Sequence, residues 1–275
     1  MSDPLTWLRA PCVMGILNAT PDSLWGGEGA LAPGPAMERL ARMADDGAAI
    51  CDIGAESTRP GAEPVGAADQ LARLDGVLRA VREAPPSIAL SVDTSLAPVA
   101  EAALDAGAVL VNDVTAGRAD PGLLPLVAER GAAVCLVHML GPPRTMQSDP
   151  RYEDVLAQLR DHLAERLGAA VDAGIPEGHV ILDPGLGFGK TLAHNLALLA
   201  GVGGLASLGR PILIGVSRKS MFASLLGRDV DERLPASLAA GLAAVARGAA
   251  VLRVHDVRET VDAVRVWGAV WAGAA

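Results

Sequence analysis

Cysteine is scarce in this sequence, and it never falls in a pattern that binds metal or forms a disulfide framework. The three cysteines, Cys12, Cys51 and Cys135, are far apart in the 275 residues, and none belongs to a Cys-x-x-Cys pair. Each lies in an apolar segment. We therefore expect three buried free thiols in a protein from a reducing compartment.

The chain also lacks the features of membrane, secreted and nucleic-acid-binding proteins. No uncharged apolar run is long enough to span a bilayer, and no basic region followed by an apolar core opens the chain. The net charge of -9 argues against nucleic acid or an anionic membrane as a partner. Charged residues make up 20% without a long biased tract. We predict a folded, soluble, cytoplasmic protein.

A nucleotide-binding P-loop is absent as well, although one stretch imitates it. Residues 183–191 read Asp-Pro-Gly-Leu-Gly-Phe-Gly-Lys-Thr and follow an apolar run. A P-loop needs a glycine five residues before its Gly-Lys-Thr ending, and that position is Pro184. The stretch instead predicts a strand that ends in an acidic side chain, followed by a tight turn.

Short apolar runs alternate with stretches of helical spacing along the whole chain. The runs are apolar on both faces, which is typical of buried parallel strands. Eight such units without a linker predict an α/β fold, a single (β/α)8 TIM barrel domain over residues 1–275. A doubly wound open sheet, the alternative, would usually have fewer strands and a glycine turn after the first. The eight runs are Val13–Leu17, Ala48–Ile53, Ile88–Val92, Val109–Val111, Ala133–Val137, Val180–Leu182, Ile212–Val216 and Val251–Val254.

Every predicted strand ends in polar or charged residues. The C-terminal rim of such barrels carries the active site, and capping alone does not explain eight polar strand ends. The rim residues are Asn18, Asp52, Asp93 with Thr94, Asn112 with Asp113, His138, Asp183, Ser217 to Lys219, and Arg253 with His255.

Hydrogen-bond acceptors and cations occupy different parts of this rim. Acceptors that suit the N–H groups of a flat heterocycle end strands three, four and six: Asp93, Asn112 and Asp183. Cations that suit an anion follow strands seven and eight: Lys219, Arg253 and His255. Strand one neighbours strand eight in a closed barrel, so Asn18 joins the cationic corner. The predicted ligand has an N–H-rich ring at one end and a phosphate or diphosphate at the other.

Eight segments of the chain match a known enzyme family. They are Met14–Ser23, Glu56–Gly61, Ser91–Thr94, Asn112–Val114, His138-Met139, Asp183–Lys190, Ser217–Ser220 and Arg253–Val257. Some of these segments are weak when taken singly, but all of them in this order are highly specific. On these segments the chain resembles the dihydropteroate synthases over essentially its full length. The resemblance implies that 4-aminobenzoate displaces diphosphate from a dihydropterin methyl diphosphate. It also implies Mg²⁺, a homodimer and a target of sulfonamides.

The resemblance further implies residue roles. The pterin ring would be bound by Asp93, Asn112, Asp183 and Lys219. The diphosphate would be contacted by Thr58, Arg59, Arg253 and His255, with Asn18 as a ligand of its magnesium. The aminobenzoate pocket would be formed by Arg59, Pro60, Phe188, Ser217 and Lys219. The residues expected to act in catalysis are Lys219, Arg253, His255 and Asp93; no protein nucleophile is needed, so the cysteines are assigned to the core.

One departure lies in the loop after the first strand. The family usually continues Ser-Phe-Ser-Asp-Gly-Gly, whereas this chain has Ser-Leu-Trp-Gly-Gly-Glu over residues 23–28. We expect Trp25 to take over the role of the missing phenylalanine at the aminobenzoate site. Two alternatives stay open: a pterin-binding paralogue with weak or no activity, and a methyltransferase that uses methyltetrahydrofolate. The second has no need of the predicted diphosphate corner.

Overall fold

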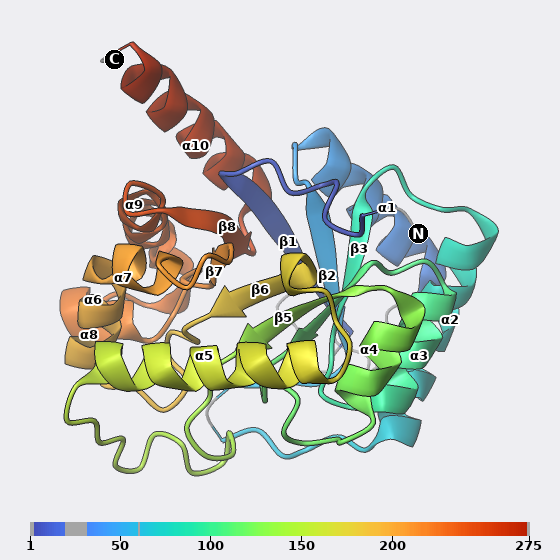
Figure 1. Cartoon of the computed structure of the whole chain (residues 1–275). Helices are drawn as coiled ribbons and strands as arrows, with labels where there is room; N and C mark the ends of the chain where they lie inside the picture. Colours follow the sequence, from blue (N-terminus) through green and yellow to red (C-terminus); the bar gives the residue numbers. More distant parts are fainter. Residues whose placement is uncertain (1–2, 20–31, 60, 274–275) are drawn as a thin grey trace.

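A computed structural model describes residues 3–19, 32–59 and 61–273. Eight parallel strands close into a barrel in sequence order, because β1 pairs with both β2 and β8. This confirms the predicted (β/α)8 barrel over the open sheet (Figure 1). The strands are β1 (Cys12–Asn18), β2 (Ile50–Gly54), β3 (Ala89–Asp93), β4 (Leu110–Asp113), β5 (Ala133–Val137), β6 (Val180–Asp183), β7 (Ile212–Ile214) and β8 (Ala249–Val254).

Helices cover the outside of the barrel (Figure 1). Those between the strands are α1 (Pro33–Asp45), α2 (Ala67–Glu83), α3 (Ala97–Asp105), α4 (Leu123–Arg130), α5 (Val155–Asp172), α6 (Leu192–Ala200), α7 (Val202–Ala206), α8 (Met221–Leu226) and α9 (Leu234–Val245). Helix α10 (Val257–Ala272) follows β8, and its end projects beyond the barrel. None of the helices in the described ranges is long and apolar enough to cross a membrane.

The strands are apolar on both faces because each face packs on a different core. In β5, Val134 and Leu136 belong to the layer between sheet and helices, whereas Ala133, Cys135 and Val137 belong to the barrel interior. This alternation follows from the two-residue period of a strand. Short apolar runs are therefore sufficient to define the barrel strands.

The structure confirms that the cysteines are core residues. All three thiols are free and buried: Cys51 lies between sheet and helices, whereas Cys12 and Cys135 lie in the barrel interior. Burial raises the pKa of each thiol, that of Cys12 to about 11. A thiol with a raised pKa is a poor nucleophile at neutral pH, which agrees with a structural role.

Strand β7 is shorter than the sequence predicts. It ends at Ile214, two residues before the predicted end at Val216, and its pairing with β8 shifts register between Ile212 and Leu213. Gly215 and Ser217 line a cavity instead of continuing the sheet. The early end of β7 therefore brings the following loop into the mouth of the barrel.

Candidate active site

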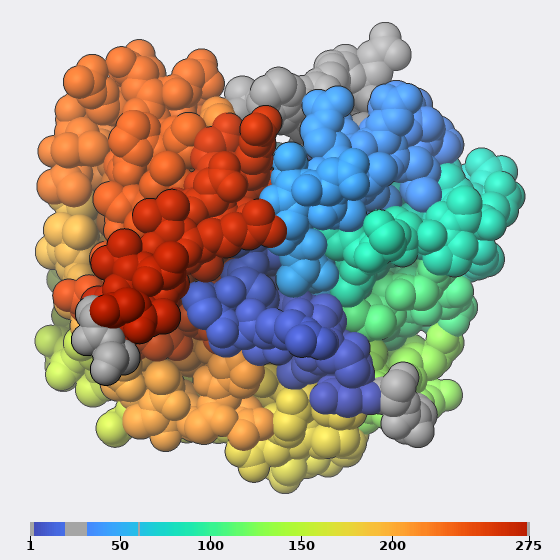
Figure 2. All heavy atoms as spheres, turned by 90° about the horizontal axis from the view of Figure 1, so that it is seen from above, coloured from blue at the N-terminus to red at the C-terminus, as the bar shows by residue number. Residues whose placement is uncertain are grey.

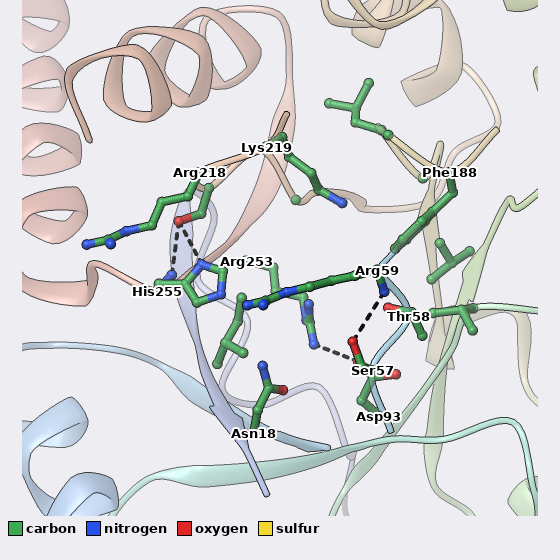
Figure 3. Close-up of a pocket in the computed structure, with 18 of the residues that line it drawn as sticks. Asn18, Ser57, Thr58, Arg59, Asp93, Phe188, Arg218, Lys219, Arg253 and His255 are labelled. Carbon is green, nitrogen blue, oxygen red and sulfur yellow. Dashed lines mark hydrogen bonds and ion pairs between the residues drawn. The ribbon is translucent and has the colours of Figure 1, made fainter. Parts of the chain in front are cut away.

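A cavity of about 510 Å³ opens at the C-terminal ends of the strands. Figure 3 shows side chains from several different strands and loops converging on it. Of the predicted site residues, Pro60 lies outside the described part of the chain. All the others line this one cavity: Asn18, Thr58, Arg59, Asp93, Asn112, Asp183, Phe188, Ser217, Lys219, Arg253 and His255.

The floor of the cavity is a buried charge network that crosses the barrel. Arg253 on β8 donates from Nε to Asp52 Oδ2 and from Nη2 to Asp93 Oδ2, each at 2.7 Å. Asn112 donates to Asp52 Oδ2 at 2.9 Å. The predicted separation of cations from carboxylates is therefore wrong at Arg253. An eight-stranded barrel is narrow enough for one long side chain on β8 to reach β2 and β3 through the barrel interior, past the neighbouring strand β1.

Asp52 is a member of this network to which the sequence analysis assigned no role. It is fully buried in β2, and Ile50, two residues earlier, packs in the barrel interior. Side chains two apart on a strand share a face, so Asp52 also points inward. That signal was present in the sequence, since an aspartate interrupts an otherwise apolar run.

Two carboxyls in the floor are shifted toward their neutral forms. Burial raises the pKa of Asp93 to about 7, while Arg253 opposes the shift. Burial also raises the pKa of Asp183, opposed by the Gly185 N–H, which donates to Asp183 Oδ1 at 2.6 Å. Among the described residues, Asn112 Oδ1 has no hydrogen-bond partner although it is buried. These acceptors fit a ligand that brings its own N–H donors.

A cation lies over an aromatic ring on the other side of the cavity. The Lys219 ammonium is 4.1 Å from the centre of the Phe188 ring. Burial lowers the pKa of Lys219 to about 8, with Asp183 opposing the shift. A flat ring that carries an anionic group would gain both stacking and charge attraction here.

The third group of residues is cationic or neutral and polar. Ser217 Oγ lies 3.1 Å from His255 Nδ1 and accepts a 3.1 Å bond from the His255 backbone N–H. Burial and the nearby Arg253 lower the pKa of His255 to about 4, so this imidazole is neutral at pH 7. Figure 3 shows the Arg59 side chain reaching across the cavity toward His255. Together they form a corner with several N–H donors.

Comparison with known proteins identifies the family. The model of the pterin binding enzyme family matches residues 14–255. The Escherichia coli K12 dihydropteroate synthase is 43% identical over 94% of this chain and 91% of its own. The chain belongs to the dihydropteroate synthase family of pterin-binding enzymes. A Yersinia pestis dihydropteroate synthase in a sulfonamide complex is 42% identical, with a TM-score of 0.91 over 96% of both chains. A Xanthomonas albilineans dihydropteroate synthase holding 7,8-dihydropteroate is 42% identical, with a TM-score of 0.84 over 96% of this chain and 95% of that chain.

In this dihydropteroate synthase fold, Lys190 organises the loop after β6. The side chain is buried, and its Nζ donates to the carbonyl oxygens of Gly185 at 2.9 Å and Phe188 at 3.0 Å and lies 3.0 Å from His138 Nδ1. A β-carbon on Gly185 would collide with the His138 carbonyl oxygen, so only glycine permits this close approach. Lys190 therefore fixes the turn that presents Phe188, a role that the sequence pattern did not reveal.

The loop that carries Thr58 and Arg59 is tied down at its base by Gln70. This glutamine of α2 is fully buried, and its Nε2 donates to Glu56 Oε2 at 3.0 Å. Its Oε1 accepts from Thr94 at 3.0 Å, directly after the site residue Asp93. The second loop of the dihydropteroate synthase site is thereby joined to the end of β3.

The residues around Asn18 fit magnesium that is shared with a ligand. Within the described ranges, no group of three or more His, Cys, Asp or Glu side chains could hold a metal. Asn18 supplies one neutral oxygen at the cavity wall, and Gly54 beside it leaves that oxygen uncrowded. Magnesium keeps several waters and is usually bound through few protein ligands plus substrate phosphates. The altered first loop, including Trp25, lies outside the described residues.

Proposed function

We propose that this enzyme condenses 6-hydroxymethyl-7,8-dihydropterin diphosphate with 4-aminobenzoate to give 7,8-dihydropteroate and diphosphate. The observation that carries the proposal is the single cavity in which buried acceptors, a cation over an aromatic ring and a donor-rich corner face one another. Similar Xanthomonas albilineans enzymes hold 4-aminobenzoic acid or 7,8-dihydropteroate, which supports these substrates. The test is formation of 7,8-dihydropteroate from both substrates.

The pterin ring lies on the floor of the cavity. Its N–H groups donate to Asp93, Asn112 and Asp183, three acceptors that would otherwise stay buried with few partners. Lys219, on the cavity wall, faces the ring from the side of Asp183. The charge network under the floor keeps the acceptors in place, because Arg253 holds Asp93 directly.

The reaction needs no covalent intermediate with the protein. The amine nitrogen of 4-aminobenzoate forms a bond to the methylene carbon as the carbon–oxygen bond to diphosphate breaks. The electron pair leaves with diphosphate, and the amine proton passes to solvent. The electron-rich pterin spreads the positive charge that develops on the methylene carbon. Arg59, Thr58 and His255 stabilise the departing diphosphate through donors aimed at its charge.

Turnover requires a divalent cation, with magnesium the expected one. A bound magnesium would neutralise charge on the diphosphate, held by Asn18, phosphate oxygens and water. Excess EDTA should stop product formation, and added Mg²⁺ should restore it. Pterin binding without metal should persist, since the ring site is separate. Undiminished turnover in EDTA would contradict the metal site.

Deprotonation of Lys219 should lower the activity of the enzyme at alkaline pH. It also forms the aminobenzoate pocket, together with Phe188, Ser217 and Arg59. Its pKa is lowered to about 8, so the ammonium that attracts the carboxylate of aminobenzoate is present below that pH and lost above it. The kcat/KM for aminobenzoate should therefore fall above about pH 8 in the parent. In Lys219→Arg this fall in the pH profile, its alkaline limb, should be absent because arginine stays charged. Persistence of the same limb in that variant would assign it to another group, such as Lys190.

The enzyme works as a homodimer in the cytoplasm, and helix α10 supplies the dimer surface. Figure 2 shows α10, in red, exposed beside the blue N-terminal segment. Three of its apolar side chains are largely exposed: Val266 at 65%, Val270 at 67% and Trp271 at 61%. Burying such a patch against a second copy would remove its exposed apolar area from water.

The dimer is tested by sedimentation at micromolar concentration. The parent should sediment as a dimer, and replacing Val266 and Val270 together by lysine should give a folded monomer. Val171→Lys is the matched control, because Val171 on α5 is also exposed, at 42%, but lies on another helix. A parent that stays monomeric at high concentration would contradict the assignment.

Two other functions are less well supported. A methyltransferase that uses methyltetrahydrofolate would not need the donor-rich corner at Arg59 and His255. An inactive pterin-binding paralogue would not need a second pocket such as the one formed by Lys219 and Phe188. Loss of methyl groups from methyltetrahydrofolate would favour the first alternative, and pterin binding without product would favour the second.

A further inference from the structure

An ion pair joins the two loops that follow β7 and β8. Arg218 donates from Nε to Asp256 Oδ2 at 2.9 Å and from Nη2 to Asp256 Oδ1 at 2.6 Å. Both side chains are largely buried, with 16% and 14% exposed. This two-pronged geometry fixes the orientation of both groups, not just their distance. The more distant Asp231, 3.5 Å from Nη1, is 83% exposed and adds little constraint.

The backbone of Arg218 adopts a conformation that is unusual for a residue with a side chain. Its φ is 56°, in the left-handed region. The start of α9 holds this conformation from both sides: the Arg218 N–H donates to Ser237 Oγ at 2.9 Å, and its carbonyl accepts from Arg233 at 3.1 Å. Such conformations persist where the surroundings enforce them, and they gather at functional sites.

Asp256 gives up a favourable interaction to make this pair. It occupies the position before α10, where an aspartate ordinarily accepts hydrogen bonds from the first turn of the helix. In this structure its side chain makes no such bond to α10. Both carboxylate oxygens are directed to Arg218 instead. The contact with Arg218 is therefore preferred over the helix cap.

The residues next to the pair are the site residues themselves. Ser217 and Lys219 flank Arg218, and His255 precedes Asp256. The left-handed turn at Arg218 sets the directions of its two neighbours, and Figure 3 shows Lys219 pointing into the cavity while the Arg218 side chain points away from it. A second link, from Ser217 Oγ to His255, connects the same two loops inside the cavity.

We infer that Arg218 and Asp256 are positioning residues, whose ion pair fixes Ser217 and Lys219 on one loop relative to His255 on the other. The inference rests on the proposed function. Ser217 belongs to the aminobenzoate pocket alone, and Lys219 belongs to that pocket as well as facing the pterin ring, so loss of the pair should weaken aminobenzoate use most. The floor residues that bind the pterin ring lie on other strands and should keep their affinity.

A double-mutant cycle with Arg218→Gln and Asp256→Asn tests the inference. Each single variant should raise the KM for aminobenzoate by about tenfold, and the double variant should raise it by about tenfold as well, because the two act as a unit. The Kd for 6-hydroxymethyl-7,8-dihydropterin, which lacks the diphosphate, should change by less than about threefold. Effects that multiply to about a hundredfold in the double variant would overturn the inference.

Arg130→Gln is the matched control. Arg130 also pairs with two carboxylates, Glu101 and Asp105, but on the outer helices α3 and α4. It should change stability without changing either constant. If Arg218→Gln does not fold, the nearly isosteric Asp256→Asn alone decides, and a KM within about twofold of the parent would refute the inference. A parent that forms no dihydropteroate would instead refute the proposed function.

Discussion

Asp183→Ala should abolish pterin binding while the barrel stays folded. Asp183 is buried at the end of β6, where burial raises its pKa and the ammonium of Lys219 opposes the shift. A pterin ring that brings N–H donors gives this carboxylate the partners it lacks. Each hydrogen bond to a charged group contributes about 1.5–3 kcal/mol. The loss of two such bonds should therefore lower the pterin affinity so far that binding is no longer detected. Calorimetry with the pterin measures the loss directly.

Asp183→Asn serves as the matched control. Its amide oxygen can still accept from the Gly185 N–H, so the turn after β6 keeps its shape. The amide also brings donors where the ring needs an acceptor, so pterin affinity should fall here too. Unchanged affinity in Asp183→Ala, or full affinity in Asp183→Asn, would contradict the role of the carboxylate.

Arg253→Ala should cost both activity and stability. It leaves Asp52, which is fully buried, and Asp93 without the cation that holds them. Removing one partner of a buried ion pair typically costs about 3–5 kcal/mol, because a buried charge is left uncompensated. Arg253→Lys keeps the charge but loses the two-pronged contact, so it should recover part of the stability. Urea unfolding of the parent and both variants measures the difference.

The loss of stability in Arg253→Ala should depend on pH, and the pKa of Asp93 determines at which pH the loss is larger. The pKa of Asp93 is raised to about 7, above its ordinary value, so the folded protein binds this proton more tightly than the unfolded chain does. Stability from this group is therefore greatest at low pH and is lost as pH rises toward the folded pKa. Removing Arg253 raises that pKa further, so the deficit of Arg253→Ala should be larger at about pH 8 than at about pH 5. An equal deficit at both pH values would mean that the titration of Asp93 is not the cause.

The sequence predicts the barrel well because the determining pattern is local. Each strand is a short run that is apolar on both faces, as in Val134 and Cys135, which pack on different cores. The rim was predictable for the same reason, since each strand end carries its own polar residue. The resemblance to the dihydropteroate synthases then gave those residues roles, and the comparisons confirm the family.

The contacts between distant strands were not predictable. Arg253 reaches Asp52 and Asp93 because the barrel is narrow. The spacing of residues in the sequence does not show which strand ends lie within reach of one side chain. From the sequence, Lys190 would be expected to be exposed to solvent, as most lysines are. It is buried because the glycine turn after β6 folds around its side chain. The left-handed conformation of Arg218 has no signature in composition, because glycine or asparagine is the usual occupant.

The most direct test of the proposed function is the stoichiometry of one reaction. The enzyme is incubated with 6-hydroxymethyl-7,8-dihydropterin diphosphate, 4-aminobenzoate and Mg²⁺, and both products are quantified over time. Diphosphate and 7,8-dihydropteroate should appear in equal amounts, and omission of aminobenzoate should suppress dihydropteroate completely. Diphosphate release without dihydropteroate, or no release at all from an enzyme that binds the pterin, would contradict the assigned reaction.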